Sequence, residues 1–399
     1  MRFGAHVLLA FAAAGVIAAC GGGSTESQTG TLRLSLTDAP ACGGYDHAWV
    51  TVEKVRVHRS STASDGDPGW SEVTLPAPTR VDLLTLTNGT LLPLGQTELP
   101  AGTYTQMRLV LSDNAGTDPP ANAVQLENSS IVPIPLTAPS GQQSGLKMNV
   151  NIEVPAGKVA DFAIDFDACR SIVKAGQSGK YLLKPVLAVI PILSDAGQRV
   201  VGWVDPSMVN GSTTVSVQMD GLPVRATPPS TSLLTTDAYG RFTLYPVPAG
   251  TYDLVISSAG RVNAVMTGVP VSDTTTTVIG NINVRFNPPP VPPLSVASYI
   301  VAGKVTGTDA TVRALQTLDS GPTVEVAATT TDLITGGSYS FTLPAAAPWS
   351  TAYKPALTTI DLAEDGSSAY RIEAKASGTT KFTDIDPFTA ATTADFVFP

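Results

Sequence analysis

The chain has few of the side chains on which most catalytic sites depend. It contains three histidines and three cysteines in 399 residues, and only His47 and His58 lie beyond the N-terminal leader. Their spacing cannot form the His-x-x-x-His motif of a zinc enzyme, and no Gly-x-Ser-x-Gly or Cys-x-x-Cys motif occurs. Residues 175–180 imitate a phosphate-binding loop but lack its spacing, so we expect a turn there.

Charged and aromatic residues are also scarce. Charged residues make up 14% and aromatic residues 6% of the chain, and the formal net charge is −9. An acidic surface repels nucleic acid and anionic lipid headgroups, so the sequence predicts no nucleic-acid partner. A glycosidase would need converging carboxylates beside aromatic side chains, whereas the four tryptophans are scattered and are interpreted as core residues. We therefore predict no enzyme activity, no cofactor and no catalytic residue.

Long apolar runs are absent, and the longest near the N-terminus, Val7–Ile17, is too short to span a bilayer. It follows Arg2 and ends in Ile17-Ala18-Ala19-Cys20. Small residues before a cysteine fit a signal-peptidase cleavage site, and the four letters resemble the lipobox of bacterial lipoproteins. The alternative is an ordinary secretory signal with a chance cysteine.

The lipobox resemblance implies a location. Residues 1–19 would be removed, Cys20 would carry the lipid (palmitate included), and residues 20–30 would form a flexible tether rich in glycine and serine. Gly21 in place of an aspartate favours the outer membrane over the inner one. The expected partners are therefore the membrane, through the lipid anchor, and an unknown protein or glycan. Whether the protein faces the periplasm or the cell surface stays open.

The residues that are abundant predict an all-β fold. Glycine (35) and proline (32) punctuate a chain of 43% hydrophobic content, the composition of short strands joined by turns. Leu32, Leu34 and Leu36 alternate with polar residues, and the parity slip at Glu53–Lys54 predicts a bulge. Further strands are expected at Trp70–Leu75, Thr105–Leu111, Ile131–Leu136, Leu146–Val154, Val159–Phe166 and Tyr181–Ile192.

The length and the punctuation divide the chain into tandem β-sandwich units. Residues 31–193 form the first unit and residues 199–287 the second. Residues 288–296 are a proline-rich linker, and residues 297–399 form a third sandwich-like unit. We expect proteolysis near the linker to leave two folded pieces.

One pentapeptide, Pro-Ala-Gly-Thr-Tyr, occurs at Pro100–Tyr104 and again at Pro248–Tyr252. Each letter suits a turn that leads into a strand, and neither threonine has an adjacent base, so we interpret the repeat as scaffold. After Tyr104 the parity would bury Arg108. Either a bulge shifts the register or Arg108 is an inward charge with a carboxylate partner.

Two resemblances to known families add to this interpretation. The second unit carries Tyr239-Gly240-Arg241-Phe242 and then Pro248–Tyr252, and it resembles carboxypeptidase regulatory-like domains of the transthyretin type. The first unit is similar to a family of bacterial lipoprotein domains of unknown function, through the segments 36–40, 52–58, 99–111, 164–173 and 179–185. The resemblances imply immunoglobulin-like or transthyretin-like sandwiches in the cell envelope, and no active site comes with them.

The acidic residues Asp161, Asp165 and Asp167 share one face of a predicted strand, opposite Ile164 and its apolar neighbours. The simplest interpretation is a solvated outer face. Asp165 and Asp167 are weak candidates for Ca²⁺ ligands, or for ion pairs with Arg170 or Arg108. Asp38, just before Ala39-Pro40, is interpreted as a turn former.

Cys42 and Cys169 are predicted to form a disulfide. Export removes the reducing cytosol, and acylation of Cys20 leaves two thiols, both near expected strand ends. Two unrelated buried thiols are the alternative. Together these features predict a lipid-anchored envelope protein with a structural or adhesive role. A calcium- or carbohydrate-binding surface lipoprotein is the alternative.

Overall fold

A computed structural model gives the fold of most of the chain. It describes residues 28–399 apart from these segments: 40–44, 128–131, 139–143, 176–177, 195, 205–207, 232–238, 280–295, 320, 332–335, 356–361 and 387. The leader, the lipobox with Cys20, Cys42 and the core of the proline-rich linker therefore lie outside the described residues.

The described chain is almost all β-strand, which confirms the predicted fold class. Its helical segments are a 3₁₀ turn, η1 (Leu83–Thr85), and a single turn of α-helix, α1 (Ala168–Ser171). Within the described ranges, no helix has both the length and the apolar character needed to cross a membrane.

The first unit (residues 28–193) packs two sheets face to face. In one, the strand order is β12-β9-β1-β4, and in the other it is β10-β11-β7-β6-β2-β5-β8, with β3 paired to β2. The strands of the first sheet are β1 (Thr29–Ala39), β4 (Leu92–Pro100), β9 (Val159–Asp167) and β12 (Val186–Pro191). Those of the second are β2 (Tyr45–His58), β3 (Ser71–Asp82), β5 (Gly102–Leu111), β6 (Ala123–Leu126), β7 (Ile134–Thr137), β8 (Leu146–Val154), β10 (Ile172–Ala175) and β11 (Lys180–Leu183).

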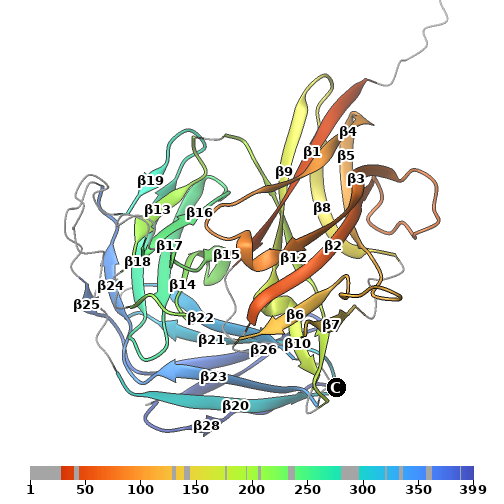
Figure 1. The fold of residues 1–399 in the computed structure, drawn as a ribbon. Helices are drawn as coiled ribbons and strands as arrows, with labels where there is room; N and C mark the ends of the chain where they lie inside the picture. Colours follow the sequence, from red (N-terminus) through yellow and green to blue (C-terminus); the bar gives the residue numbers. More distant parts are fainter. Residues whose placement is uncertain are drawn as a thin grey trace, which may run out of the picture.

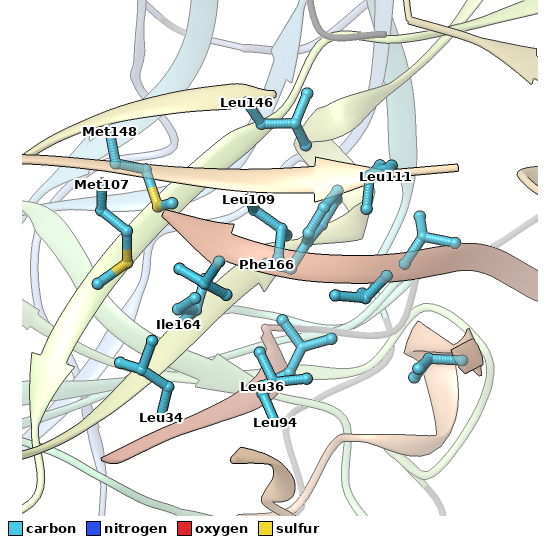
Figure 2. Packing of buried hydrophobic residues seen from close by; sticks show 14 of the residues in the cluster. Leu34, Leu36, Leu94, Met107, Leu109, Leu111, Leu146, Met148, Ile164 and Phe166 are labelled. Carbon is cyan, nitrogen blue, oxygen red and sulfur yellow. The ribbon is translucent and has the colours of Figure 1, made fainter. Parts of the chain in front are cut away.

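The core of this unit lies between the two sheets. Leu34 and Leu36 of β1 face Met107 and Leu109 of β5, and all four are fully buried, as Figure 2 shows. Ile164 and Phe166 of β9 complete the same layer, as their strand parity predicted. Each such side chain, moved from water to the core, contributes about 1.5–3 kcal/mol.

Two bulges in the second sheet change which face the following side chains point to. The register of β2 shifts between Val52 and Lys54, which confirms the predicted slip. In β5 the register shifts between Tyr104 and Gln106, so Tyr104 joins Met107 in the core. The bulge therefore occurs, and Arg108 points to the opposite, outer face of the sheet, where it is nevertheless buried.

The repeated pentapeptide makes the same hydrogen bond in both copies. The hydroxyl of Tyr104 donates to the carbonyl of Pro100 at 2.9 Å, and that of Tyr252 donates to Pro248 at 2.8 Å. Both rings are buried. A tyrosine that bonds back to the chain a few residues upstream stabilises the corner of a β-sandwich, so the repeat is scaffold.

The second unit (residues 196–279) is also a sandwich. Its smaller sheet has the order β16-β13-β19, and its larger sheet begins β15-β14-β17-β18. The strands are β13 (Val200–Trp203), β14 (Thr214–Met219), β15 (Leu222–Thr227), β16 (Arg241–Leu244), β17 (Gly250–Ser257), β18 (Ala264–Val271) and β19 (Thr277–Val278). Val215, Val217, Phe242 and Leu254 lie at the centre of its core.

The third unit (residues 296–399) packs the sheet β23-β20-β28, with β29 also on β20, against the sheet β22-β21-β26-β27. The strands are β20 (Ser298–Thr306), β21 (Thr311–Thr317), β22 (Thr323–Thr330), β23 (Ser338–Pro344), β26 (Tyr370–Ala376), β27 (Thr379–Ile385), β28 (Thr392–Thr393) and β29 (Phe396–Val397). Val301, Phe341 and Ile372 lie in the core between them.

The second and third units share a sheet. Two strands that follow β23 in the chain, β24 (Trp349–Ala352) and β25 (Ala363–Glu364), extend the larger sheet of the second unit, where β24 pairs in parallel with β18. A small apolar cluster of Val255, Val265, Leu318 and Val324 also joins the two units. The domain boundaries inferred from the sequence stay predictions, but units two and three are not separate in space (Figure 1).

The direction of β1 orients the first unit. Thr31 pairs with Val159 near the start of the strand, and Ala39 pairs with Asp167 at its other end. At about 3.3 Å per residue the strand is roughly 36 Å long. Its far end carries Asp38 and reaches β15 of the second unit.

Candidate functional site

A cavity of about 970 Å³ lies where the three units meet. The first unit contributes β10 and β12 to its wall, the second contributes β15, and the third contributes β22 and β23. The volume is at the upper end of the range for ligand pockets, about 300–1,000 Å³. Asp165, Asp167 and Cys169, all singled out from the sequence, line this cavity.

Asp165 joins the first unit to the second. Its carboxylate forms an ion pair with Arg225 of β15, whose side chain is only 1% exposed. Nη2 of Arg225 also donates to Oγ1 of Thr37 at 2.7 Å and to the carbonyl of Asp38 at 2.9 Å. A guanidinium forks to several acceptors at once, so one buried side chain fixes β15 against the end of β1.

Two further carboxylates lie beside this pair. Asp38 is fully buried within β1, rather than in the expected turn, because β1 continues to Ala39. Its Oδ1 accepts from the main-chain N–H of Ala168 at 3.0 Å, while Oδ2 has no hydrogen-bond partner among the described residues. Burial raises the pKa of Asp38 well above its ordinary value, and the nearby carboxylates of Asp167 and Asp165 act in the same direction.

Asp167 forms the N-cap of α1, where its side chain accepts from the main-chain N–H of Arg170 at 2.9 Å. Burial raises the pKa of Asp167, and the adjacent guanidinium of Arg170 partly offsets that effect. Burial likewise lowers the pKa of Arg170 and raises that of Tyr45 on the cavity wall. These side chains are half-buried or buried, and the lower local dielectric strengthens their pairwise interactions.

Glu325 of β22 is the point at which the three units meet. Its carboxylate forms ion pairs with Arg170 of the first unit and, at 3.3 Å, with Arg313 of the third. Its main chain pairs with Gln218 of the second unit: Gln218 Nε2 donates to the Glu325 carbonyl at 2.6 Å, and the Glu325 N–H donates to Gln218 Oε1 at 2.8 Å. The Gln218 amide thus occupies the place of a peptide group on a neighbouring strand.

The three aspartates of β9 do not act together. Asp161 lies on the outer side, where it accepts from Nε of Arg33 at 2.8 Å. Asp165 is buried against Arg225, and Asp167 is paired with Arg170. The solvated face was therefore wrong for Asp165, because the second unit covers it. Among the residues that the structure describes, no three His, Cys, Asp or Glu side chains converge as metal ligands would.

The predicted disulfide stays a prediction. Cys169 lies in α1 on the cavity wall and is not free, but Cys42 lies outside the described residues, as does Cys20. The closeness of α1 to the end of β1 is shown by the bond from Ala168 to Asp38. Cys42 follows Asp38 by four positions in the sequence.

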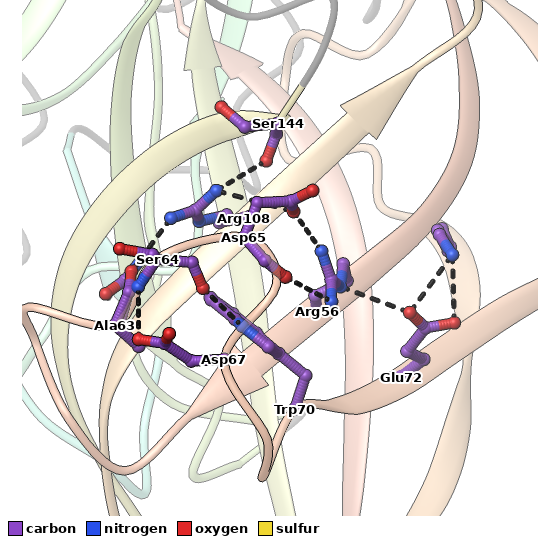
Figure 3. Close-up of polar contacts among 11 residues, drawn as sticks. Arg56, Ala63, Ser64, Asp65, Asp67, Trp70, Glu72, Arg108 and Ser144 are labelled. Atoms are coloured by element: carbon purple, nitrogen blue, oxygen red, sulfur yellow. Dashed lines mark hydrogen bonds and ion pairs between the residues drawn. The ribbon is translucent and has the colours of Figure 1, made fainter.

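A second polar cluster covers the outer face of β2 and β5 (Figure 3). Arg56 and Arg108 flank the ring of Trp70, with guanidinium carbons 4.6 and 4.8 Å from its centroid. Asp65 pairs with both arginines, and Arg108 donates to the carbonyls of Ala63 and Ser144 at 2.9 and 3.0 Å. These contacts hold the loop of residues 59–70 against the sheet and cover Arg108, so this buried arginine has a structural role.

Arg225, Glu325 and Gln218 were not singled out from the sequence. A signal was present: each is the one strongly polar residue in a strand otherwise built of apolar, hydroxyl-bearing or proline residues, as in Leu222–Thr227 and Thr323–Thr330. A lone charge in such a strand is either exposed or paired in the interior. Deciding between the two requires the position of the neighbouring unit.

Comparison with known proteins gives a family match for the first unit alone. Residues 29–185 match the model of a domain of unknown function, DUF4382. No curated protein matches the chain. Among solved structures, one similar chain is a point variant of BcpA, the major pilin subunit of Bacillus cereus, with 10% identity, 92% of this chain and 99% of that chain covered, and a TM-score of 0.12. The first unit thus matches a DUF4382 domain, and the relation of the second unit to regulatory-like domains stays a prediction.

Proposed function

We propose that this protein is a lipid-anchored protein of the cell envelope, with a non-catalytic structural or binding role. Its three units would form one rigid body, and the cavity at their junction would be its binding site. The observation that most directly supports a rigid body is the junction at Glu325. Each of the three units contributes a partner to this one buried residue. Bodies joined only by flexible linkers do not bury charges between them.

The charged groups of the cavity fit a binding role better than a catalytic one. Asp165 and Glu325 are each neutralised by a buried or half-buried arginine, and Asp167 is held as a helix cap. A general base must be free to take a proton, and a nucleophile needs such a base beside it. The paired carboxylates stabilise the walls of the cavity instead.

The anchor would hold the cavity away from the membrane. From Cys20 to the start of β1 at Thr29 the tether spans roughly 30 Å or less when fully extended. The first unit would then lie next to the membrane. The second and third units, which lie at the far end of β1, would face away from it.

The anchor is tested with Cys20→Ser. We expect the wild-type protein to fractionate with membranes and to enter the detergent phase, and the variant to accumulate as unprocessed precursor. Ser24→Ala is the matched control, because it changes the predicted tether beside Cys20 without touching the lipobox. Detergent partitioning of a mature-sized Cys20→Ser protein would contradict the proposal.

A further inference from the structure

Much of the cavity wall is made of strand edges rather than of sheet faces. Side chains alternate along a strand, so a cavity over a sheet face contacts every second residue. Here the contacts run through consecutive residues, Glu325–Thr330 on β22 and Ser338–Thr342 on β23. Both strands end the order of their sheets, as do β10, β12 and β15. Five sheet edges therefore border the cavity, and alternate residues of the interior strands β9 and β14 complete its wall.

The hydrogen-bond pattern shows which groups of β23 face outward. Val305 N–H donates to Gly337, and Ala345 N–H donates to Ala297, both at 2.8 Å. In an antiparallel pair the bonded residues alternate with residues that point their N–H and C=O away. Given the register with β20, the outward residues are Ser338, Ser340 and Thr342. Their main-chain groups have no partner within the described part of the chain.

Pro344 supports this assignment. It is the next residue in the outward phase of β23, and it is the one residue type that lacks an N–H to offer. Proline is tolerated in a strand where its missing N–H would face away from the neighbour.

The neighbouring edge of β22 has the same character. Thr331 N–H donates to Ala310 at 2.8 Å, which places Ala328 and Thr330 in the outward phase. At Glu325 the main chain of this edge already forms two hydrogen bonds with the side-chain amide of Gln218, one as acceptor and one as donor. Beyond that point, Oγ1 of Thr330 is buried and has no hydrogen-bond partner among the described residues. The edge can thus bind amide groups, and its last part is unoccupied within the described structure.

Two other edges, those of β3 and β27, are protected, but that of β23 is not. The edge strand β3 carries Pro76 and Pro78, and β27 carries Lys381, devices that hinder pairing with another chain. Before Pro344, β23 reads Ser-Tyr-Ser-Phe-Thr-Leu, with no charge and no bulge in its register with β20. A free edge of this kind is a template for an additional strand.

We propose that the edge of β23 within the cavity binds an extended peptide segment of a partner protein as an added β-strand. This inference rests on the proposed binding role of the cavity and names its ligand class. Ser338–Thr342 offers three outward residues over about 17 Å, enough for a segment of about five residues. Main-chain hydrogen bonds give such complexes their affinity, and alternate side chains give their specificity.

The walls define the chemistry of the segment. The side chains of Tyr339 and Phe341 face the core of the third unit, so an added strand would place alternate apolar side chains beside them. Its other side chains would lie beside the exposed hydroxyls of Ser338, Ser340 and Thr342. The acidic groups of the cavity are already paired with Arg225 and Arg170. Because Lys174 also lines the cavity, the matching segment has no basic side chain, alternates apolar with small polar residues, and lacks proline at paired positions.

The experiment pans a phage-displayed library of random dodecapeptides on the detergent-solubilised protein, and then compares two variants. Ser340→Pro removes an outward N–H that β20 does not use, whereas Ser340→Ala keeps that N–H and removes only the hydroxyl. We expect alternating, proline-free peptides that bind Ser340→Ala like wild type and bind Ser340→Pro roughly tenfold or more weakly, the loss of about one good interaction. Hydrogen exchange at the amides of Ser340 and Thr342 should slow when peptide is bound.

Unfolding curves of the variants serve as the control for folding, and Thr342→Pro replaces Ser340→Pro if the latter is unfolded. Peptides that bind Ser340→Pro as well as wild type, or a library without binders, would overturn the inference. Saturable binding on a glycan array in place of peptides would overturn it as well, yet would leave the binding role of the cavity standing. Dimers of this chain that Ser340→Pro dissociates would make a second copy the occupant and would also overturn it.

Discussion

At the scale of single residues, the junction depends on a few buried polar side chains. Arg225 makes the clearest case, because it bonds to Asp165, Thr37 and the main chain of Asp38 while its side chain is 1% exposed. Breaking a buried pair leaves an uncompensated charge in the interior. Such residues fix the position of one unit against another more than they add net stability.

We predict that Arg225→Met lowers the free energy of unfolding by about 3–5 kcal/mol, since Asp165 would remain buried without its cation. Adding Asp165→Leu should recover most of the loss, because a well-packed apolar pair replaces the ion pair. Urea unfolding of the two variants and of Asp165→Leu alone measures both effects. Equal stability of Arg225→Met and wild type would show that the pair is not buried in solution.

Asp38 predicts a pH dependence of stability. Its native pKa is raised by burial, so between its ordinary value near 4 and the native value the folded state binds more protons than the unfolded state. The contribution of Asp38 to the free energy of unfolding is therefore fully present below pH ~4. It declines as the pH rises through the native pKa, by up to about 1.4 kcal/mol per pH unit. Asp167 changes in the same direction, while Arg225 opposes it at Asp38.

Asp38→Asn should flatten this decline, because an amide keeps the acceptor for Ala168 and does not ionise. The slope that remains would come from Asp167. Urea midpoints of wild type and Asp38→Asn between about pH 4 and pH 8 provide the measurement, a window that starts at the ordinary aspartate pKa. A variant with an unchanged slope would rule out Asp38 as the titrating group.

At the scale of elements, the alternation of apolar residues was a reliable guide. It placed Leu32, Leu34 and Leu36 in the core and located the bulge near Lys54, because each feature depends only on neighbours in the same strand. The fate of Asp165 could not be inferred in this way. Its face of β9 is polar by parity, and only the packing of the second unit turns that face into an interior.

The pairing of β24 with β18 of the second unit could not be predicted from the sequence either. Trp349–Ala352 has the same strand character as its neighbours, and nothing in four residues says that its partner is β18 of another unit. Strand partners are set by long-range packing, so a linker rich in proline was the stronger local signal. Such a linker suggests a boundary along the chain, but it carries no information about whether the units on either side separate in space.

A protease site inserted within residues 288–293 tests whether the pairing of β24 with β18 holds the second and third units together. We expect cleavage to leave the two fragments in one complex, since β24 pairs with β18 and Gln218 pairs with Glu325 across the junction. Size-exclusion chromatography of the cleaved protein in native buffer, with a urea-treated sample as the control, reports the association. Fragments that separate in native buffer would contradict the shared sheet.

At the scale of the whole molecule, β1 separates the N-terminal end of the first unit from the cavity between the units. The chain enters β1 at one end, and the other end lies beside the junction and its cavity. An anchored protein built in this way would present the free edges of β22 and β23 away from the membrane. A rigid body is needed for this, because flexible units would leave the cavity without fixed walls.

Scanning calorimetry tests that rigidity most directly. If the three units are locked by the buried pairs of Arg225 and Glu325 and by the sheet shared through β24, the protein unfolds in one cooperative transition, with a calorimetric enthalpy equal to the van't Hoff value. The variant Arg225→Met should lower or split that transition. Separate transitions for the units in the wild-type protein, unaffected by Arg225→Met, would contradict the account.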